Sequence, residues 1–114
     1  MEIRFSCKPG SGRANHGKVM GEDGLISEVI SLDRGKTWQK KGNPPRPATG
    51  AEKKVALATH IIRQGGSVHN HIVVDNMQLV LSADVSEVEV FDMGDRRELT
   101  ETEITGALLA IAAI

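Results

Sequence analysis

Tyrosine is absent from this 114-residue sequence, and aromatic residues make up only 3% of it. Proteins that bind single-stranded nucleic acid usually stack bases on aromatic side chains, and this inventory is scarce here. An excess of charge of one sign is lacking as well, because 14 basic residues nearly balance 15 acidic ones and leave a formal net charge of -1. Such a balance gives the whole molecule no field to attract nucleic acid or an anionic membrane, which argues against both as partners.

Cysteine occurs once, as Cys7, so no internal disulfide is possible, and this fits a reducing compartment. No apolar run approaches the length that spans a membrane. The N-terminus has neither the basic run nor the apolar segment of a signal peptide. We therefore expect a soluble, cytoplasmic protein. Hydrophobic residues make up 39% of the chain, enough for one modest core in a single α+β domain of residues 1–114.

Polar and apolar residues alternate over residues 2–7, which predicts a half-buried strand with Ile3, Phe5 and Cys7 on its apolar face. On that face Cys7 is expected to be buried and inert, not a nucleophile. Residues 8–24 hold five glycines and many polar groups. This composition predicts a long loop, with a short strand at residues 18–20 as an option.

Residues 31–38 form the octet Ser-Leu-Asp-Arg-Gly-Lys-Thr-Trp, whose centre is a tight-turn signal between two β-prone runs. The octet resembles the Asp-box of sialidase-type propellers, with the pattern S-x-D-x-G-x-T-W, at all five fixed positions. In that family the box is a folding device at a hairpin turn, so the resemblance implies no catalytic residue. One copy cannot make a propeller, whose blades repeat at roughly 40 to 50 residues. We expect a β-hairpin whose turn is fixed by Ser31, Asp33, Gly35 and Thr37, with Trp38 anchoring it to the core.

Two capping boxes predict two helices. Thr49 and Glu52 open the first helix, which is expected to end near residue 64, before Gly65 and Gly66. Thr100 and Glu103 open the second, over residues 101–113, and this helix is apolar on most of its surface.

Residues 69–91, between the helices, are predicted to form a meander of three strands, followed by a charged loop over residues 92–98. The apolar runs at residues 72–74 and 79–81 lack alternation, so these strands are expected to be covered on both faces. The resulting architecture is α+β: an antiparallel sheet or roll of about six strands, in two βββα-like halves, with two helices packed on it. The apolar terminal helix and the doubly apolar strands predict a homo-oligomer formed through the C-terminal helix or the sheet.

Residues 12–18 fit the pattern G-x-x-x-x-G-K, but Val19 stands where a P-loop needs Ser or Thr, and no good helix follows. The P-loop interpretation is therefore excluded. Exposed backbone N–H groups of this segment, with Lys8, Arg13, His16 and Lys18, form a candidate site for a small anionic ligand such as a phosphate or carboxylate. The alternative is a solvated loop without a ligand.

His69 and His71 would face the same side of a strand, where both imidazoles can approach one ion. Zinc would need at least a third ligand, from Cys7, His16, His60 or Asp75, and none of these has a recognisable motif spacing. We therefore expect no metal and no cofactor, with the His69 and His71 site as the alternative.

No set of residues at a recognisable spacing predicts catalysis, so the sequence leans away from an enzyme. We expect a small non-catalytic binding or accessory protein that acts as a homo-oligomer and binds a small anionic ligand or a protein partner. Two alternatives remain: a small metal-dependent hydrolase or nuclease that uses His69 and His71, and a weak nucleic-acid binder that uses the lysines and arginines of the glycine-rich segment.

Overall fold

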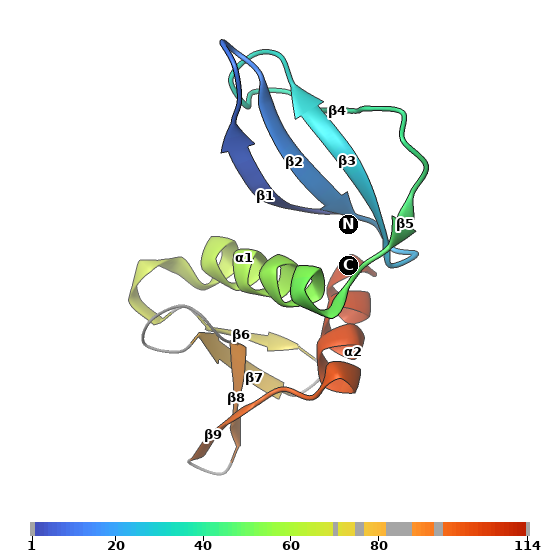
Figure 1. Cartoon of the computed structure of the whole chain (residues 1–114). Helices are drawn as coiled ribbons and strands as arrows, with labels where there is room; N and C mark the ends of the chain where they lie inside the picture. The colour runs from blue at the N-terminus through green and yellow to red at the C-terminus, as the bar shows by residue number, and fades with distance from the viewer. Residues whose placement is uncertain (1, 70, 75–76, 82–87, 93–94, 114) are drawn as a thin grey trace.

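The computed structural model describes residues 2–69, 71–74, 77–81, 88–92 and 95–113. Two antiparallel sheets and two helices form an α+β fold, as the sequence predicts (Figure 1). The strands are more numerous than expected and divide between an N-terminal and a C-terminal sheet. Helix α1 (Gly50–His69) lies between these sheets and contacts strands of both, while α2 (Glu101–Ala112) packs against α1 (Figure 1).

The N-terminal sheet has the order β1-β2-β3-β4, with the short β5 also paired to β3. Its strands are β1 (Ile3–Pro9), β2 (Asn15–Met20), β3 (Leu25–Ser31), β4 (Gln39–Lys40) and β5 (Arg46–Pro47). The prediction of a long loop over residues 8–24 is wrong in part: β2 includes the optional short strand at residues 18–20 but begins earlier, at Asn15. Pairing with β1 on one side and β3 on the other satisfies the backbone of β2 and outweighs the weak strand propensity of its residues.

The prediction that Cys7 is buried is wrong, because a β-bulge interrupts β1. The register shifts between Phe5 and Lys8, and Ser6 adopts a left-handed conformation with φ +52°. Ile3 and Phe5 remain buried, whereas Cys7 is exposed. The extra residue of the bulge moves Cys7 off the face that strict alternation assigns to it.

The C-terminal sheet has the order β6-β7-β8-β9. Its strands are β6 (His71–Val74), β7 (Met77–Leu81), β8 (Val88–Asp92) and β9 (Asp95–Glu98). The expected charged loop over residues 92–98 is wrong in part, because β9 pairs with β8 through most of that segment. The predicted end of α1 near residue 64, before Gly65 and Gly66, is also wrong, because the helix continues to His69. A helical glycine costs only about 1 kcal/mol, which continued backbone hydrogen bonding can offset.

The core joins both sheets to both helices. Its fully buried centre combines side chains of β1, β3, α1, β7 and α2: Phe5, Ile26, Leu57, Ile61, Leu79 and Ile111. The prediction of double coverage is confirmed for β7, where residues 79–81 are all buried. It is wrong for β6, where Val73 is 70% exposed.

Helix α2 buries most of its apolar surface within the chain, at Ile104, Ala107, Leu108, Ile111 and Ala112. Leu109 remains 49% exposed. Intramolecular packing therefore accounts for most of the apolar character that led us to expect a homo-oligomer, and the oligomer stays a prediction. Within the described residues, neither helix has the length and apolarity that crossing a bilayer requires.

Candidate functional site

Cationic side chains gather at one end of the N-terminal sheet. The β1–β2 turn (residues 10–14) and the β3–β4 turn (residues 32–38), which we call the distal turns, lie at the end of this sheet away from the helices (Figure 1). The backbone N–H of Arg34 donates to the carbonyl oxygen of Arg13 at 3.0 Å and ties the two turns together. Arg13, Arg34 and Lys36 are exposed on these turns, and Lys8 is exposed near the end of β1.

Three of the four residues predicted to bind a small anion lie at the same end of the N-terminal sheet, and the binding of an anion there stays a prediction. Lys8 pairs with His16 across β1 and β2, and Arg13 lies in the turn that joins these strands. The Lys18 side chain instead reaches the start of α1, where its Nζ donates to Glu52 Oε2 at 3.0 Å. The Nδ1 atom of His16 is buried and has no hydrogen-bond partner within the described part of the chain.

The octet of residues 31–38 forms the predicted hairpin turn. Ser31 Oγ accepts a hydrogen bond from the N–H of Gly35 at 2.7 Å and donates to Asp33 Oδ1 at 2.7 Å. The Asp33 carboxylate also accepts from the N–H of Thr37 at 2.8 Å and from its hydroxyl at 2.6 Å. These bonds, above all those from Thr37, hold the pKa of Asp33 well below its usual range. The carboxylate is therefore ionised at neutral pH, with its charge directed into the turn.

Trp38 lies against Gly17 of β2 in the N-terminal sheet. A Cβ atom on Gly17 would lie 3.4 Å from Trp38 Cζ3 and 2.9 Å from Cys7 Sγ, so the absence of a side chain there leaves room for the indole ring. The indole Nε1–H donates to the carbonyl of Gly35 at 3.2 Å. The Arg4 guanidinium lies 5.1 Å from the ring centroid, within cation–π range. Trp38 is half-buried and lies outside the core cluster, so it anchors the turn to the sheet surface. The expectation that it reaches the core is therefore wrong.

Glu52 connects the start of α1 to the N-terminal sheet. Its carboxylate accepts two hydrogen bonds from Arg46, at 2.7 and 2.6 Å, and one from Lys18 at 3.0 Å. It also accepts from the N–H of Thr49 at 3.0 Å, while the Thr49 hydroxyl accepts from the N–H of Glu52, so the predicted capping box is confirmed. The Arg46 hydrogen bonds outweigh burial and hold the pKa of Glu52 well below its usual range.

Helix α2 begins with the same arrangement. Arg97 donates two hydrogen bonds to Glu103, at 2.8 and 2.9 Å, and Thr100 completes the predicted capping box. The Arg97 hydrogen bonds are the main reason that the pKa of Glu103 falls to about 2. Both helices therefore start with the pattern R-x-x-T-x-x-E, which the capping boxes alone do not reveal.

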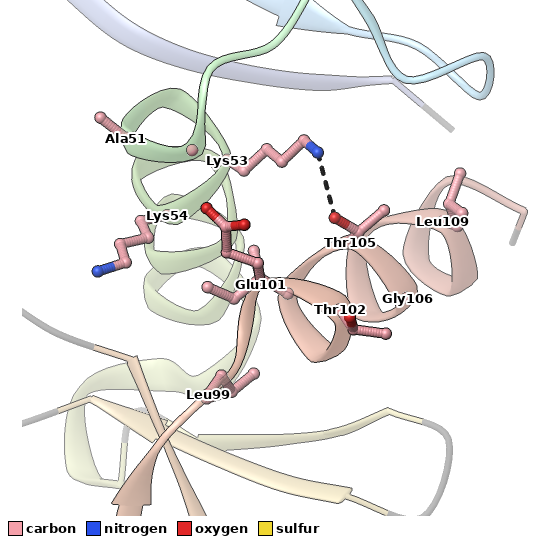
Figure 2. A pocket seen from close by; sticks show the side chains of 11 residues that line it. Ala51, Lys53, Lys54, Leu99, Glu101, Thr102, Thr105, Gly106 and Leu109 are labelled. Atoms are coloured by element: carbon pink, nitrogen blue, oxygen red, sulfur yellow. Dashed lines mark hydrogen bonds between the residues drawn. The ribbon is translucent and has the colours of Figure 1, made fainter.

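A cavity of about 840 Å³ lies between the N-terminal parts of α1 and α2 (Figure 2). Leu99, Ile104 and Leu109 give it apolar walls. Lys53 Nζ donates to Thr105 Oγ1 at 3.1 Å across the gap between the helices (Figure 2). Cavities of roughly 300–1,000 Å³ typically hold small ligands, and this one suits a molecule with an apolar body and polar groups. No pattern in the sequence indicates this cavity, because the residues that line it come from two helices about fifty positions apart.

The alternative metal site stays a prediction, because the side chains of His69 and His71 lie outside the described residues, as does Asp75. Across the side chains that the structure does describe, no three or more His, Cys, Asp or Glu residues are grouped so as to hold a metal ion. His60 is buried on α1, and burial lowers the pKa of its imidazole.

The near-zero net charge conceals a division between the two halves of the chain. Residues 1–49 hold nine lysines and arginines against five acidic residues, a formal charge of +4. Residues 50–114 hold five against ten, a formal charge of -5. Counting charges separately on each side of the first capping box would have shown this polarity from the sequence.

The chain is similar to known proteins in one of three comparisons. No model of a known protein family matches it, and no solved structure matches it. The curated proteins to which it is similar include the queuine tRNA-ribosyltransferase of Idiomarina loihiensis, 25% identical over 115 residues that cover 92% of this chain and 30% of that protein. The queuine tRNA-ribosyltransferase of Shewanella sp. strain ANA-3 is 28% identical over 109 residues, covering 87% of this chain and 28% of that protein. The chain thus spans less than a third of the length of these relatives.

This similarity corrects the functional prediction. The relatives are enzymes whose name states an action on tRNA, which contradicts the expectation of a non-catalytic binding or accessory protein. It also removes support from the argument against nucleic acid as a partner. That argument relied on the net charge of the whole chain and on the small number of aromatic residues, and neither quantity reports where the charges and the tryptophan lie.

Proposed function

We propose that this chain takes part in the enzymatic modification of tRNA and contacts the RNA through the distal turns. The observation that carries the proposal is the cluster of exposed cations at that end of the sheet: Lys8, Arg13, Arg34 and Lys36. Lysine and arginine side chains bind nucleic acid by neutralising backbone phosphates and releasing counterions. The curated relatives, whose name states an action on tRNA, support this choice of polyanion.

The other charges of the N-terminal half favour the same surface. Glu22 and Asp23 occupy the β2–β3 turn, at the opposite end of the sheet from the distal turns. Asp33 is the acidic residue of the distal turns, and hydrogen bonds from Ser31 and Thr37 already engage its carboxylate. A phosphate that approaches the distal turns therefore meets several cations and one internally hydrogen-bonded carboxylate.

Binding of a tRNA transcript at several salt concentrations tests the proposal. Four phosphate contacts predict that log K falls with log salt concentration with a slope of about -3. Arg13→Glu and Lys36→Glu, tested singly, should each weaken binding by about tenfold and make the slope less steep by about one unit.

Arg63→Glu is the matched control, because Arg63 is exposed on α1 in the acidic half and its replacement changes the net charge equally. Its effect on tRNA binding should be less than about twofold. Equal losses in all three variants would indicate a response to net charge alone and refute the assignment to the distal turns. Absence of tRNA binding at low salt would refute the proposed function itself.

A further inference from the structure

Trp38 carries an accessible aromatic surface next to the cations of the distal turns. A shallow hollow of about 250 Å³ is lined by Trp38 together with Ile30, Leu32, Asp33, Thr37 and Gln39. Leu32 is 61% exposed although it is apolar. The hollow is smaller than the pockets of ~300–1,000 Å³ that enclose small ligands, so it suits one flat ring lying against its wall.

The indole ring is held in place before any ligand arrives. Its Nε1–H donates to the carbonyl of Gly35 at 3.2 Å, and the bare backbone of Gly17 lies beneath Cζ3. A fixed aromatic ring gains more from stacking than a mobile one, because little side-chain entropy remains to be lost. The Arg4 guanidinium lies over the ring, 5.1 Å from its centroid, and does not line the hollow, so a stacked base would have to use the part of the ring that faces the hollow.

We infer that Trp38 is a stacking site for one unpaired nucleobase of the RNA, and this inference rests on the proposed function. An aromatic face combined with cations that follow the backbone is the usual recognition mode for unpaired nucleotides. The bases of a duplex are already stacked on one another and expose no free face to Trp38. The inference therefore specifies single-stranded segments of tRNA, such as loops or ends, as the part that contacts the hollow.

Trp38 is the single tryptophan of the chain, so intrinsic fluorescence reports directly on its ring. We would titrate the protein with a single-stranded oligouridylate, with an RNA duplex of equal length, and with inorganic polyphosphate, which has no bases. Oligouridylate should quench the emission. Polyphosphate should compete for the cations of the distal turns and leave the emission unchanged.

Two substitutions separate stacking from folding. Trp38→Phe keeps an aromatic face, whereas Trp38→Leu keeps apolar volume without one, and thermal melts show whether each variant remains folded. If a base stacks on the ring, the affinity of Trp38→Leu for labelled oligouridylate should fall about tenfold, because the aromatic face is lost. The affinity of Trp38→Phe should fall less than about threefold. Polyphosphate affinity should change less than about twofold in either variant.

The outcomes distinguish the two proposals. Oligouridylate that binds without quenching, and with equal affinity to the Phe and Leu variants, would refute stacking on Trp38 and leave RNA binding by the distal turns standing. Failure of every RNA to bind would refute the proposed function together with this inference. If a folded Leu variant cannot be obtained, duplex RNA that quenches as strongly as oligouridylate would refute the preference for an unpaired base.

Discussion

Replacing Glu52 with glutamine tests how α1 is joined to the N-terminal sheet. The Glu52 side chain is 12% exposed and accepts hydrogen bonds from Arg46, Lys18 and the N–H of Thr49. Glutamine has nearly the same shape, but it carries no charge and offers one acceptor oxygen in place of two. Its amide N–H groups would face cations that need an acceptor. The variant therefore weakens the capping box and removes both ion pairs without leaving a cavity.

The expected loss follows from the exposure of the partners. The capping interaction is worth about 1 kcal/mol. Lys18 and Arg46 are 33% and 46% exposed and can turn to water, so their ion pairs add little to that value. We expect a total loss of about 1–2 kcal/mol in the free energy of unfolding, or a fall of about 4–8 °C in Tm.

Thermal denaturation followed by circular dichroism at several pH values provides the measurement. The pKa of Glu52 lies below its ordinary value of 4.5 in the folded protein, so the ionised carboxylate contributes fully above that pH. Its contribution is lost as the pH falls through the folded-state value, and the difference between wild type and Glu52→Gln should shrink accordingly. Glu98→Gln, an exposed position on β9, should change Tm by less than about 2 °C. A difference that is negligible at pH 7, or unchanged at pH 2, would refute this account of Glu52.

Three further changes test other features of the fold. Glu103→Gln should also lower Tm at neutral pH, and because the pKa of Glu103 is about 2, its contribution should be lost between pH 4.5 and about 2 in the same melts. Gly17→Ala should cost about 1–3 kcal/mol and shift the emission of Trp38, because its Cβ would lie 2.9 Å from Cys7 Sγ; an unchanged melt and spectrum would contradict the packing described. Ser6→Gly should raise the free energy of unfolding by about 0.5–1 kcal/mol in urea, since φ at this residue is +52°, and a loss of stability would show that the Ser6 side chain is needed in the bulge.

Elements specified by contacts close in the chain were predictable from the sequence. The capping boxes at Thr49 and Thr100 and the turn of residues 31–38 each depend on side chains that bond to backbone within four residues, and all three form as predicted. Elements specified by distant pairing were missed. Strand β2 lies in a glycine-rich segment and is held by its neighbours, β9 is a run of four charged residues paired to β8, and the bulge at Ser6 is visible only in the register of β1 against β2.

The candidate site shows the same division. Lys8, Arg13 and His16 were identified from one segment and do lie at one end of the sheet. Arg34 and Lys36 were not linked to them, because the contact between the distal turns joins residues about twenty positions apart, Arg13 and Arg34. The position of Trp38 depends on Gly17 in another strand, and the partner of Lys18 lies on α1. Each of these placements follows from the folded topology, which local pattern reading does not supply.

The opposite charges of the two halves have a consequence for the encounter with the RNA that we propose as a partner. The chain measures 47 Å along its longest dimension, several times the Debye length of ~8 Å at physiological ionic strength, so an approaching polyanion responds to the nearer end separately. The two sheets lie on opposite sides of α1 (Figure 1), and the acidic half repels a phosphate backbone while the basic half attracts it. For the proposed RNA partner, the resulting torque should turn the molecule during diffusion, so that encounters begin with the distal turns foremost. Orientation before contact raises the association rate at low salt, and added salt should slow association more than it speeds dissociation.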